Sequence, residues 1–353
     1  MGDAIWQEPV RGGLFPPELF GLSGVEQLRL FLSNRAPRPP ISYLTGMRPT
    51  EVGIGSAAFT MPISPWLQTP QGLAIGGEVA ILADAPLGSA VQTVLPPATG
   101  YTTSELSINL VRPVPKSGKL IARGRLVHGG RQLALSETFV TDDTGRLIAV
   151  GTSRCVIFPP VPDVLPPPAE IPVVATEDDD WIPPFERPVR GDVLGQDLWG
   201  SRSGLDVLRT LIAGGLPAPP LSHLLGVFPI DASEGSCAFS MPASGWLASP
   251  TGLVEGGVTA CLADVSLAGA VQTTVPAGTA LASTDLRVQF IRPLPADGRS
   301  VTARASVVHR GRGVAAARAE VTNEQGKLVA LASGSAVILP GRRADLDDAP
   351  ALG

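Results

Sequence analysis

The chain has 353 residues, of which 44% are hydrophobic, 17% charged and 5% aromatic, and its mean hydropathy is +0.23. This composition excludes a disordered protein, and the length predicts two cores, because single cores rarely grow past ~250 to 300 residues. The net charge of −5, from 27 Lys and Arg against 32 Asp and Glu, offers no basic stripe for a phosphate backbone and argues against nucleic acid as a partner.

The elements of the chain follow one order twice. A short helix over 25–33 precedes a strand over 51–61, and a long apolar helix runs from a Gly-Gly pair to about Thr93. Turn signals then separate four strands, at 102–111, 119–128, 132–141 and 146–158. The second series has a helix over 205–213, a strand over 231–241 and a long helix that ends near Thr273. A helix that is apolar on nearly every side, followed by hairpin-linked strands, predicts an α+β fold in which an antiparallel sheet wraps around a long central helix.

An internal repeat explains this order. Shifting the sequence by 180 residues aligns 25–124 with 205–304 without a gap, and 39 of these 100 positions are identical. Solenoid repeats are shorter, at ~20 to 50 residues, so the chain is predicted to be a tandem duplication of one compact domain.

A proline-rich, acidic segment separates the two copies. We place the N-terminal domain at 10–158, the linker at 159–189, the C-terminal domain at 190–340 and a loose polar tail at 341–353. The linker contains the run Pro166-Pro167-Pro168 and the acidic stretch 177–180. Because proline is excluded from helix interiors and central strands, the linker is predicted to be an extended spacer that can reach across the molecule.

The two most apolar stretches, 73–91 and 253–271, are not predicted to span a membrane. Each contains two acidic residues, whereas a spanning helix is almost free of charge over roughly 20 residues. The first residues lack the basic start and apolar stretch of a secretory signal, and the cysteines at 155, 237 and 261 form neither a CxxC motif nor an even disulfide framework. We therefore expect a cytoplasmic protein with no metal site and no membrane partner.

Asp84 and Asp264 are the strongest candidates for chemistry. Each interrupts a long apolar helix within the sequence Leu-Ala-Asp, where an unpaired carboxylate costs several kcal/mol. Such a buried acid suits a functional site. The alternative is a structural carboxylate that caps or pairs at a domain boundary.

Gly76 and Gly256 begin the same helices. The free N–H groups and partial positive charge of a helix N-terminus suit a developing oxyanion, although a glycine pair can also simply allow a tight turn. Gly76 and Asp84 are eight residues apart, or roughly 12 Å along a helix, so one acyl carbonyl cannot contact both. If the two copies pack about a pseudo-twofold axis with antiparallel helices, Gly76 faces Asp264 and Gly256 faces Asp84, which creates one or two composite sites.

Several motifs occur in the same order in both copies: Pro-x-Gly-x-x-x-Gly-Gly, Leu-Ala-Asp, an alternating strand that ends in Arg-Pro, and His-x-Gly-Arg. This set, over about 37–158 and 217–339, resembles the hotdog-fold acyl-CoA thioesterases of the PaaI-like group, here in a tandem, double-hotdog form. The resemblance implies hydrolysis of acyl-CoA thioesters, no cofactor other than the CoA of the substrate, and a homodimer of such chains. It assigns the oxyanion N–H to Gly76 and Gly256, the general base or nucleophile to Asp84 and Asp264, and substrate contacts to Gly77 and Gly257.

The chain departs from the family pattern beside the glycine pairs. The residue before the pair is typically His in the family and is Ile75 and Glu255 here, and the Asn or Gln six residues earlier is replaced by Thr69 and Ser249. We keep these four positions as substrate-binding candidates, because the two hydroxyls can still orient a water.

The two composite sites are predicted to differ. In the site of Gly256 and Asp84, Glu255 adds a carboxylate that would oppose an oxyanion, and Pro86 removes a helical N–H. In the site of Gly76 and Asp264, an apolar neighbour would desolvate the aspartate and raise its pKa toward that of a useful base. We therefore rank the Gly76/Asp264 site first.

Other candidates carry less weight. Arg112 and Arg292 could bind CoA phosphates, although arginines at strand ends often reach into solvent. His128 and His309 are interpreted as structural. Besides hydrolysis, two functions stay open: non-catalytic binding of acyl-CoA or lipid, and a structural role in assembly.

Overall fold

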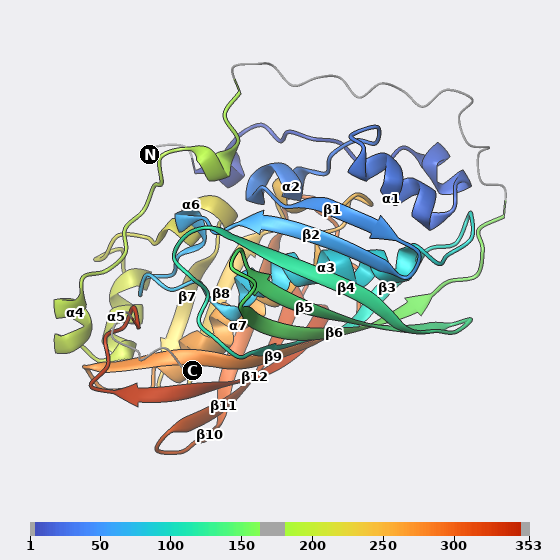
Figure 1. Cartoon of the computed structure of the whole chain (residues 1–353). Coiled ribbons are helices and arrows are strands. Elements are labelled where there is room, and N and C mark those ends of the chain that lie inside the picture. Colours follow the sequence, from blue (N-terminus) through green and yellow to red (C-terminus); the bar gives the residue numbers. More distant parts are fainter. Residues whose placement is uncertain (1–3, 163–180, 347–353) are drawn as a thin grey trace.

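The structure is a computed structural model that describes residues 4–162 and 181–346. Within these residues, a 12-stranded sheet has the order β1-β2-β4-β5-β6-β3-β9-β12-β11-β10-β8-β7, and all its pairings are antiparallel. Figure 1 shows this sheet curving around two long helices. The predicted α+β fold, a sheet wrapped around a central helix in each copy, is confirmed.

The two repeats contain corresponding elements. The first has α1 (Gly24–Leu32), α2 (Pro40–Thr45), β1 (Arg48–Gly53), β2 (Ser56–Pro62), α3 (Gly76–Gln92), β3 (Tyr101–Leu110), β4 (Lys119–Gly129), β5 (Leu133–Asp142) and β6 (Leu147–Ile157). The second has α4 (Gln196–Ser201), α5 (Gly204–Ile212), α6 (Pro220–Leu225), β7 (Phe228–Ser233), β8 (Ser236–Pro242), α7 (Gly256–Gln272), β9 (Thr279–Phe290), β10 (Ser300–Arg310), β11 (Val314–Asn323) and β12 (Leu328–Pro340).

One local expectation differs from the structure. The single strands predicted over 51–61 and 231–241 are hairpins, β1–β2 and β7–β8, because Gly55 and Gly235 have positive φ and turn the chain back. The predicted extent of the long helices is confirmed, because α3, which contains Pro86, and α7 both span 17 residues.

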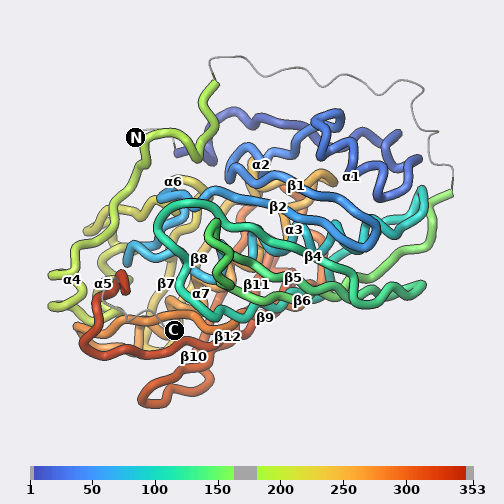
Figure 2. The backbone as a smooth tube through the Cα atoms, in the orientation of Figure 1, coloured from blue at the N-terminus to red at the C-terminus, as the bar shows by residue number. Residues whose placement is uncertain are grey.

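The two halves of the sheet meet at β3 and β9. These strands pair antiparallel, with Ile108 opposite Leu286, so that one sheet continues from the first repeat into the second. In the tube view of Figure 2, the blue-to-green and yellow-to-red halves lie against each other along this line.

Helices α3 and α7 cross in antiparallel directions inside the sheet, and glycine allows them to touch. A Cβ added to Gly77 would lie 2.7 Å from the Cα of Cys261, and one added to Gly257 would lie 2.6 Å from the Cα of Ile81. Since residue 77 meets 261 while residue 81 meets 257, the helices run in opposite directions about a pseudo-twofold axis.

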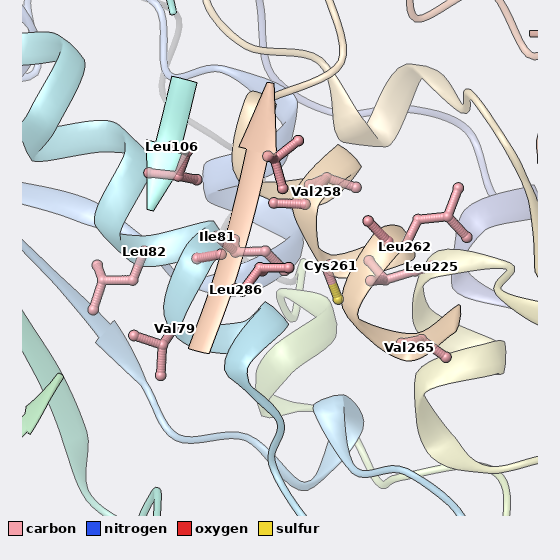
Figure 3. Close-up of a cluster of buried hydrophobic side chains, with 14 of the residues drawn as sticks. Val79, Ile81, Leu82, Leu106, Leu225, Val258, Cys261, Leu262, Val265 and Leu286 are labelled. Carbon is pink, nitrogen blue, oxygen red and sulfur yellow. The ribbon is translucent and has the colours of Figure 1, made fainter. Parts of the chain in front are cut away.

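The two repeats share one core. A single cluster of buried apolar side chains includes residues from both repeats, which overturns the expectation of two separate cores. Figure 3 shows part of it, where side chains of α3 and α7 meet those of β3 and β9; the labelled residues include Ile81, Leu82, Leu106, Val258, Cys261, Leu262 and Leu286. The shared core follows from the glycine contacts, because they bring the two apolar helices together.

The segment that precedes each repeat packs against the other repeat. Before the first repeat, Glu8 accepts a hydrogen bond through its backbone carbonyl from Trp246 Nε1 of the second repeat, at 3.0 Å. Before the second repeat, the Arg187 carbonyl accepts one from Trp66 Nε1 of the first, at 3.2 Å. An ion pair of 2.6 Å between Arg187 and Glu8 joins the two segments.

The ends of the chain bear on two further expectations. The proline run and the acidic stretch of the linker lie outside the described residues, but the linker's last residues, from Trp181, pack on the first repeat, where Trp181 contacts Tyr43. The expected loose tail is packed as far as Leu346, because Ala344 is buried and its N–H donates to Gln196 Oε1 at 2.8 Å. Among the described residues, no helix combines the length and the apolarity needed to cross a membrane.

Candidate active site

The aspartate of each central helix lies against the N-terminus of the other. Gly77 N–H donates to Asp264 Oδ2 at 2.8 Å, and Gly257 N–H donates to Asp84 Oδ2 at 3.0 Å. Both carboxylates are buried, with 2% of Asp264 and 6% of Asp84 exposed. The structure therefore brings together the two pairs of residues that the repeat geometry predicts.

The first glycine of each pair begins its helix beside the same carboxylate. A Cβ added to Gly76 would lie 3.3 Å from Asp264 Oδ2, and one added to Gly256 would lie 2.6 Å from Asp84 Oδ2. Because these residues begin helices, their N–H groups have no acceptor within the helix. In the first site the second glycine thus holds the aspartate and the first presents a helix N-terminus beside it, whereas in the second site the Gly256 N–H also donates to Asp84.

A hydroxyl group completes each carboxylate's surroundings. Thr103 Oγ1 donates to Asp84 Oδ1 in a long contact of 3.5 Å, and Ser283 donates to Asp264. These residues occupy the same position in β3 and β9, 180 residues apart. Neither residue was predicted from the sequence, although a hydroxyl retained at the same strand position in both repeats was a usable signal.

Burial raises the pKa of both aspartates to about 6. Desolvation is the largest cause in each case, because it penalises the charged form, and the hydrogen bonds from the glycine and the hydroxyl oppose it. Both groups are therefore largely ionised at neutral pH and can still accept a proton. This is the property required of a general base.

Each carboxylate adjoins a cavity between the repeats. The first, of about 690 Å³, reaches Gly76, Val265 and Ser283, which flank Asp264. The second, of about 460 Å³, is lined by Asp84, Gly256 and other residues of both repeats. Both volumes fall within the range of small-molecule sites, ~300 to 1,000 Å³.

The residues that precede the two glycine pairs differ in polarity. Ile75 lines the first cavity, whereas Glu255 lines the second and forms a hydrogen bond with Asp84. Desolvation and the charge of Asp84 raise the pKa of Glu255 to about 8. The protonated, neutral form of Glu255 is therefore favoured at neutral pH, in contrast to the ionised carboxylate predicted at this position.

Comparison with known proteins identifies the chain. The thioesterase superfamily matches residues 71–149 and 251–330, once in each repeat. Each repeat therefore carries a domain of this superfamily. The chain's predicted tandem hotdog architecture and its enzyme class are thereby confirmed, whereas the roles of individual residues stay predictions.

Solved structures share the fold of this thioesterase. The chain is similar to the tesB protein of Mycobacterium avium subsp. paratuberculosis (14% identity, TM-score 0.52) and to the acyl-CoA thioesterase II TesB2 of Mycobacterium marinum (16% identity, TM-score 0.50). A hot dog fold protein of unknown function from Alicyclobacillus acidocaldarius is similar at 13% identity with a TM-score of 0.52. Each similarity covers 85% of this chain and 98% of the other. No curated protein matches the sequence.

The other predicted residues of the thioesterase lie on the cavity walls with local partners. Thr69 Oγ1 donates to the Leu73 carbonyl at 3.1 Å, and Ser249 and Thr251 share a hydrogen bond of 3.0 Å. Thr69 lines the first cavity, which adjoins Asp264, and Ser249 lines the second cavity, which adjoins Asp84.

Two arginines lie at corresponding places on these walls. Arg112 Nη1 donates to the Leu147 carbonyl at 2.8 Å in the first cavity, and Arg292 Nη1 to the Leu328 carbonyl at 2.6 Å in the second. His128 and His309 are exposed near strand ends and line neither cavity.

Proposed function

We propose that this thioesterase hydrolyses acyl-CoA at the composite sites between its repeats, and first of all at the site of Gly76 and Asp264. The observation that carries this proposal is the crosswise contact of the central helices. The Gly77 N–H of one repeat holds the Asp264 carboxylate of the other at 2.8 Å, beside the helix N-terminus at Gly76. A base and an oxyanion donor thus lie side by side, which neither repeat provides alone.

The reaction follows from the roles of these groups. The thioester carbonyl oxygen accepts a hydrogen bond from the Gly76 N–H, whose position at the start of a 17-residue helix favours negative charge. Asp264 takes a proton from a water molecule, and the water oxygen attacks the carbonyl carbon. As the tetrahedral intermediate collapses and the C–S bond breaks, Asp264 gives this proton to the departing sulfur, so the carboxylic acid and the CoA thiol are released and the Asp264 carboxylate is restored.

The first cavity supports an apolar acyl group as the substrate. Its wall contains Leu208, Leu211, Phe239, Val265 and Leu281, all contributed by the second repeat. Burial of an acyl chain against such side chains is favourable by ~0.8 kcal/mol for each CH₂. Arg112 and Arg146 line the same cavity and supply positive charge for the phosphates of CoA.

The test is thiol release from short, medium, long and aromatic acyl-CoAs by the full chain. We expect Asp84→Asn and Asp264→Asn together to lower kcat by ~10²- to 10⁴-fold, the range typical of a lost general base. Asp143→Asn is the matched control, because Asp143 is exposed in the turn after β5. Unchanged hydrolysis in the double variant would refute the proposal. Tight binding of acyl-CoA without thiol release in the unmodified chain would favour the alternative, a non-catalytic binding protein.

A further inference from the structure

The second composite site contains a group that the first lacks. Glu255 precedes the glycine pair of α7, and both its side chain and that of Asp84 line the second cavity, together with Gly256. The corresponding position of the first site is Ile75. The two sites of one chain therefore have different acid–base chemistry.

We propose that Glu255 is a further catalytic residue of the second site, where it forms a carboxylic acid–carboxylate pair with Asp84 and donates its proton to the departing thiolate. The inference rests on the proposed acyl-CoA hydrolysis. The geometry brings the two residues together, because Asp84 Oδ2 lies against Gly256, the residue next to Glu255: a Cβ added to Gly256 would lie 2.6 Å from this oxygen. Two neighbouring carboxyl groups can hydrogen bond to each other only when one of them is protonated, and Glu255 and Asp84 are hydrogen-bond partners of this kind.

The surroundings assign the proton to Glu255. The Gly257 N–H and the Thr103 hydroxyl donate to Asp84 and stabilise its charged form, whereas desolvation and the adjacent Asp84 charge favour the neutral form of Glu255. Two adjacent carboxyl groups cannot both be ionised at low cost, because their negative charges repel each other.

Other titratable and charged groups also face this pair. Tyr101 of β3 and Cys155 of β6 have raised pKa values, each mainly because of burial, and both are neutral at physiological pH. Arg292, which follows β9, lines the cavity and donates to the Leu328 carbonyl. Because Tyr101 and Cys155 stay neutral, the proton is exchanged between Glu255 and Asp84.

The proton balance of the proposed cycle closes within the pair. Asp84 takes a proton from water, and the water oxygen attacks the carbonyl carbon held at Gly256. As the C–S bond breaks, Glu255 gives its proton to the sulfur, so the thiol leaves. Asp84 then returns its proton to Glu255 across their hydrogen bond. Asp84 is neutral when the C–S bond breaks, so its charge no longer holds the proton on Glu255, and this favours the transfer to sulfur.

The test uses the chain that carries Asp264→Asn, in which the second site alone retains its aspartate. We expect kcat for thiol release to rise through about pH 6 and to fall above about pH 8, because Asp84 must be ionised and Glu255 protonated. Adding Glu255→Gln should remove the fall at high pH and lower kcat by at least about tenfold, somewhat less than the usual effect of an acid because a thiolate leaves readily. Glu51→Gln, on the exposed face of β1, is the matched control.

The outcomes separate this inference from the proposed function. If the chain with Asp84→Asn releases thiol and the chain with Asp264→Asn does not, only this inference fails. If the unmodified chain releases no thiol from any acyl-CoA tested, the proposed function itself fails. An unchanged kcat and pH profile after Glu255→Gln would also overturn the inference. Infrared difference spectra give a second readout: a protonated-carboxyl band that disappears with Glu255→Gln supports it, and an unaltered band contradicts it.

Discussion

Glu78 is a buried acid that the proposed reaction does not use. It is the third residue of α3, it is 1% exposed, and neither of its carboxyl oxygens has a hydrogen-bond partner. Desolvation raises the pKa of this carboxyl to about 8. The corresponding residue of α7 is Val258. We predict that Glu78→Val, which copies the other repeat, stabilises the protein at neutral and alkaline pH.

The size and sign of the effect follow from linkage. The folded state holds the proton of Glu78 up to about pH 8, whereas the unfolded chain loses it near pH 4.5. The folded state therefore loses stability by ~1.4 kcal/mol per pH unit between these values. At pH 7 the difference from 4.5 corresponds to a cost of about 3 kcal/mol, and above pH 8 to about 5 kcal/mol. Glu78→Val removes this cost.

Urea unfolding at about pH 5, 7 and 8.5 measures the stability cost of burying Glu78. The gain in unfolding free energy from Glu78→Val should grow with pH, and Glu78→Gln should show the same loss of pH dependence without the gain in apolar packing. Glu51→Gln, at an exposed strand position, controls for the loss of a carboxylate. Parallel pH dependence in the unmodified chain and the Glu78→Val variant would refute the reasoning.

Three further predictions concern the helix crossing, the cavity and the base. Gly257→Ala would press a methyl group into the backbone of α3, so we expect ~1 to 3 kcal/mol lower unfolding free energy by urea titration, whereas Gly313→Ala, whose added Cβ meets no atom within 4 Å, should change little. Ala268→Phe narrows the first cavity one helical turn beyond Asp264, and kcat/KM should fall more for long than for short acyl-CoAs; an equal fall would contradict this placement of the acyl chain. In the chain with Asp84→Asn, kcat/KM should rise about tenfold per pH unit below about pH 6, and a flat profile there would contradict Asp264 as the base.

Sequence periodicity predicted the long helices and the four strands after each of them, because apolar pattern and turn residues are local signals. It did not predict the helices α2 and α6, each of which begins at a proline and is followed by a glycine with positive φ. The segments that precede each repeat and pack against the other were also missed. Their hydrogen bonds join residues more than 100 positions apart, such as Trp66 and Arg187, and no local pattern encodes such a pair.

The candidate site was predictable to the extent that the repeat encodes it. Two aspartates and two glycine pairs at equal spacing indicated that each helix would meet the other. The proton on Glu255 was not predictable, because it depends on how deeply the carboxyl is buried and on the Asp84 beside it. Thr103 and Ser283 were missed because a hydroxyl in an alternating strand looks like an ordinary solvent-facing residue.

The tandem fusion explains how the two sites can differ. Each site takes its helix N-terminus from one repeat and its aspartate from the other, so a substitution before one glycine pair alters one site and leaves the sequence of the other untouched. A symmetric dimer of identical repeats would carry the same residue before both pairs, either two isoleucines or two glutamates. Covalent duplication removes that constraint, because Ile75 and Glu255 occupy equivalent places in a nearly symmetric fold while belonging to one chain. The same reasoning applies to Glu78 and Val258, which occupy equivalent positions in the first turns of α3 and α7. The shared core keeps the folds of the two repeats similar, while the residues at the helix N-termini can differ between them.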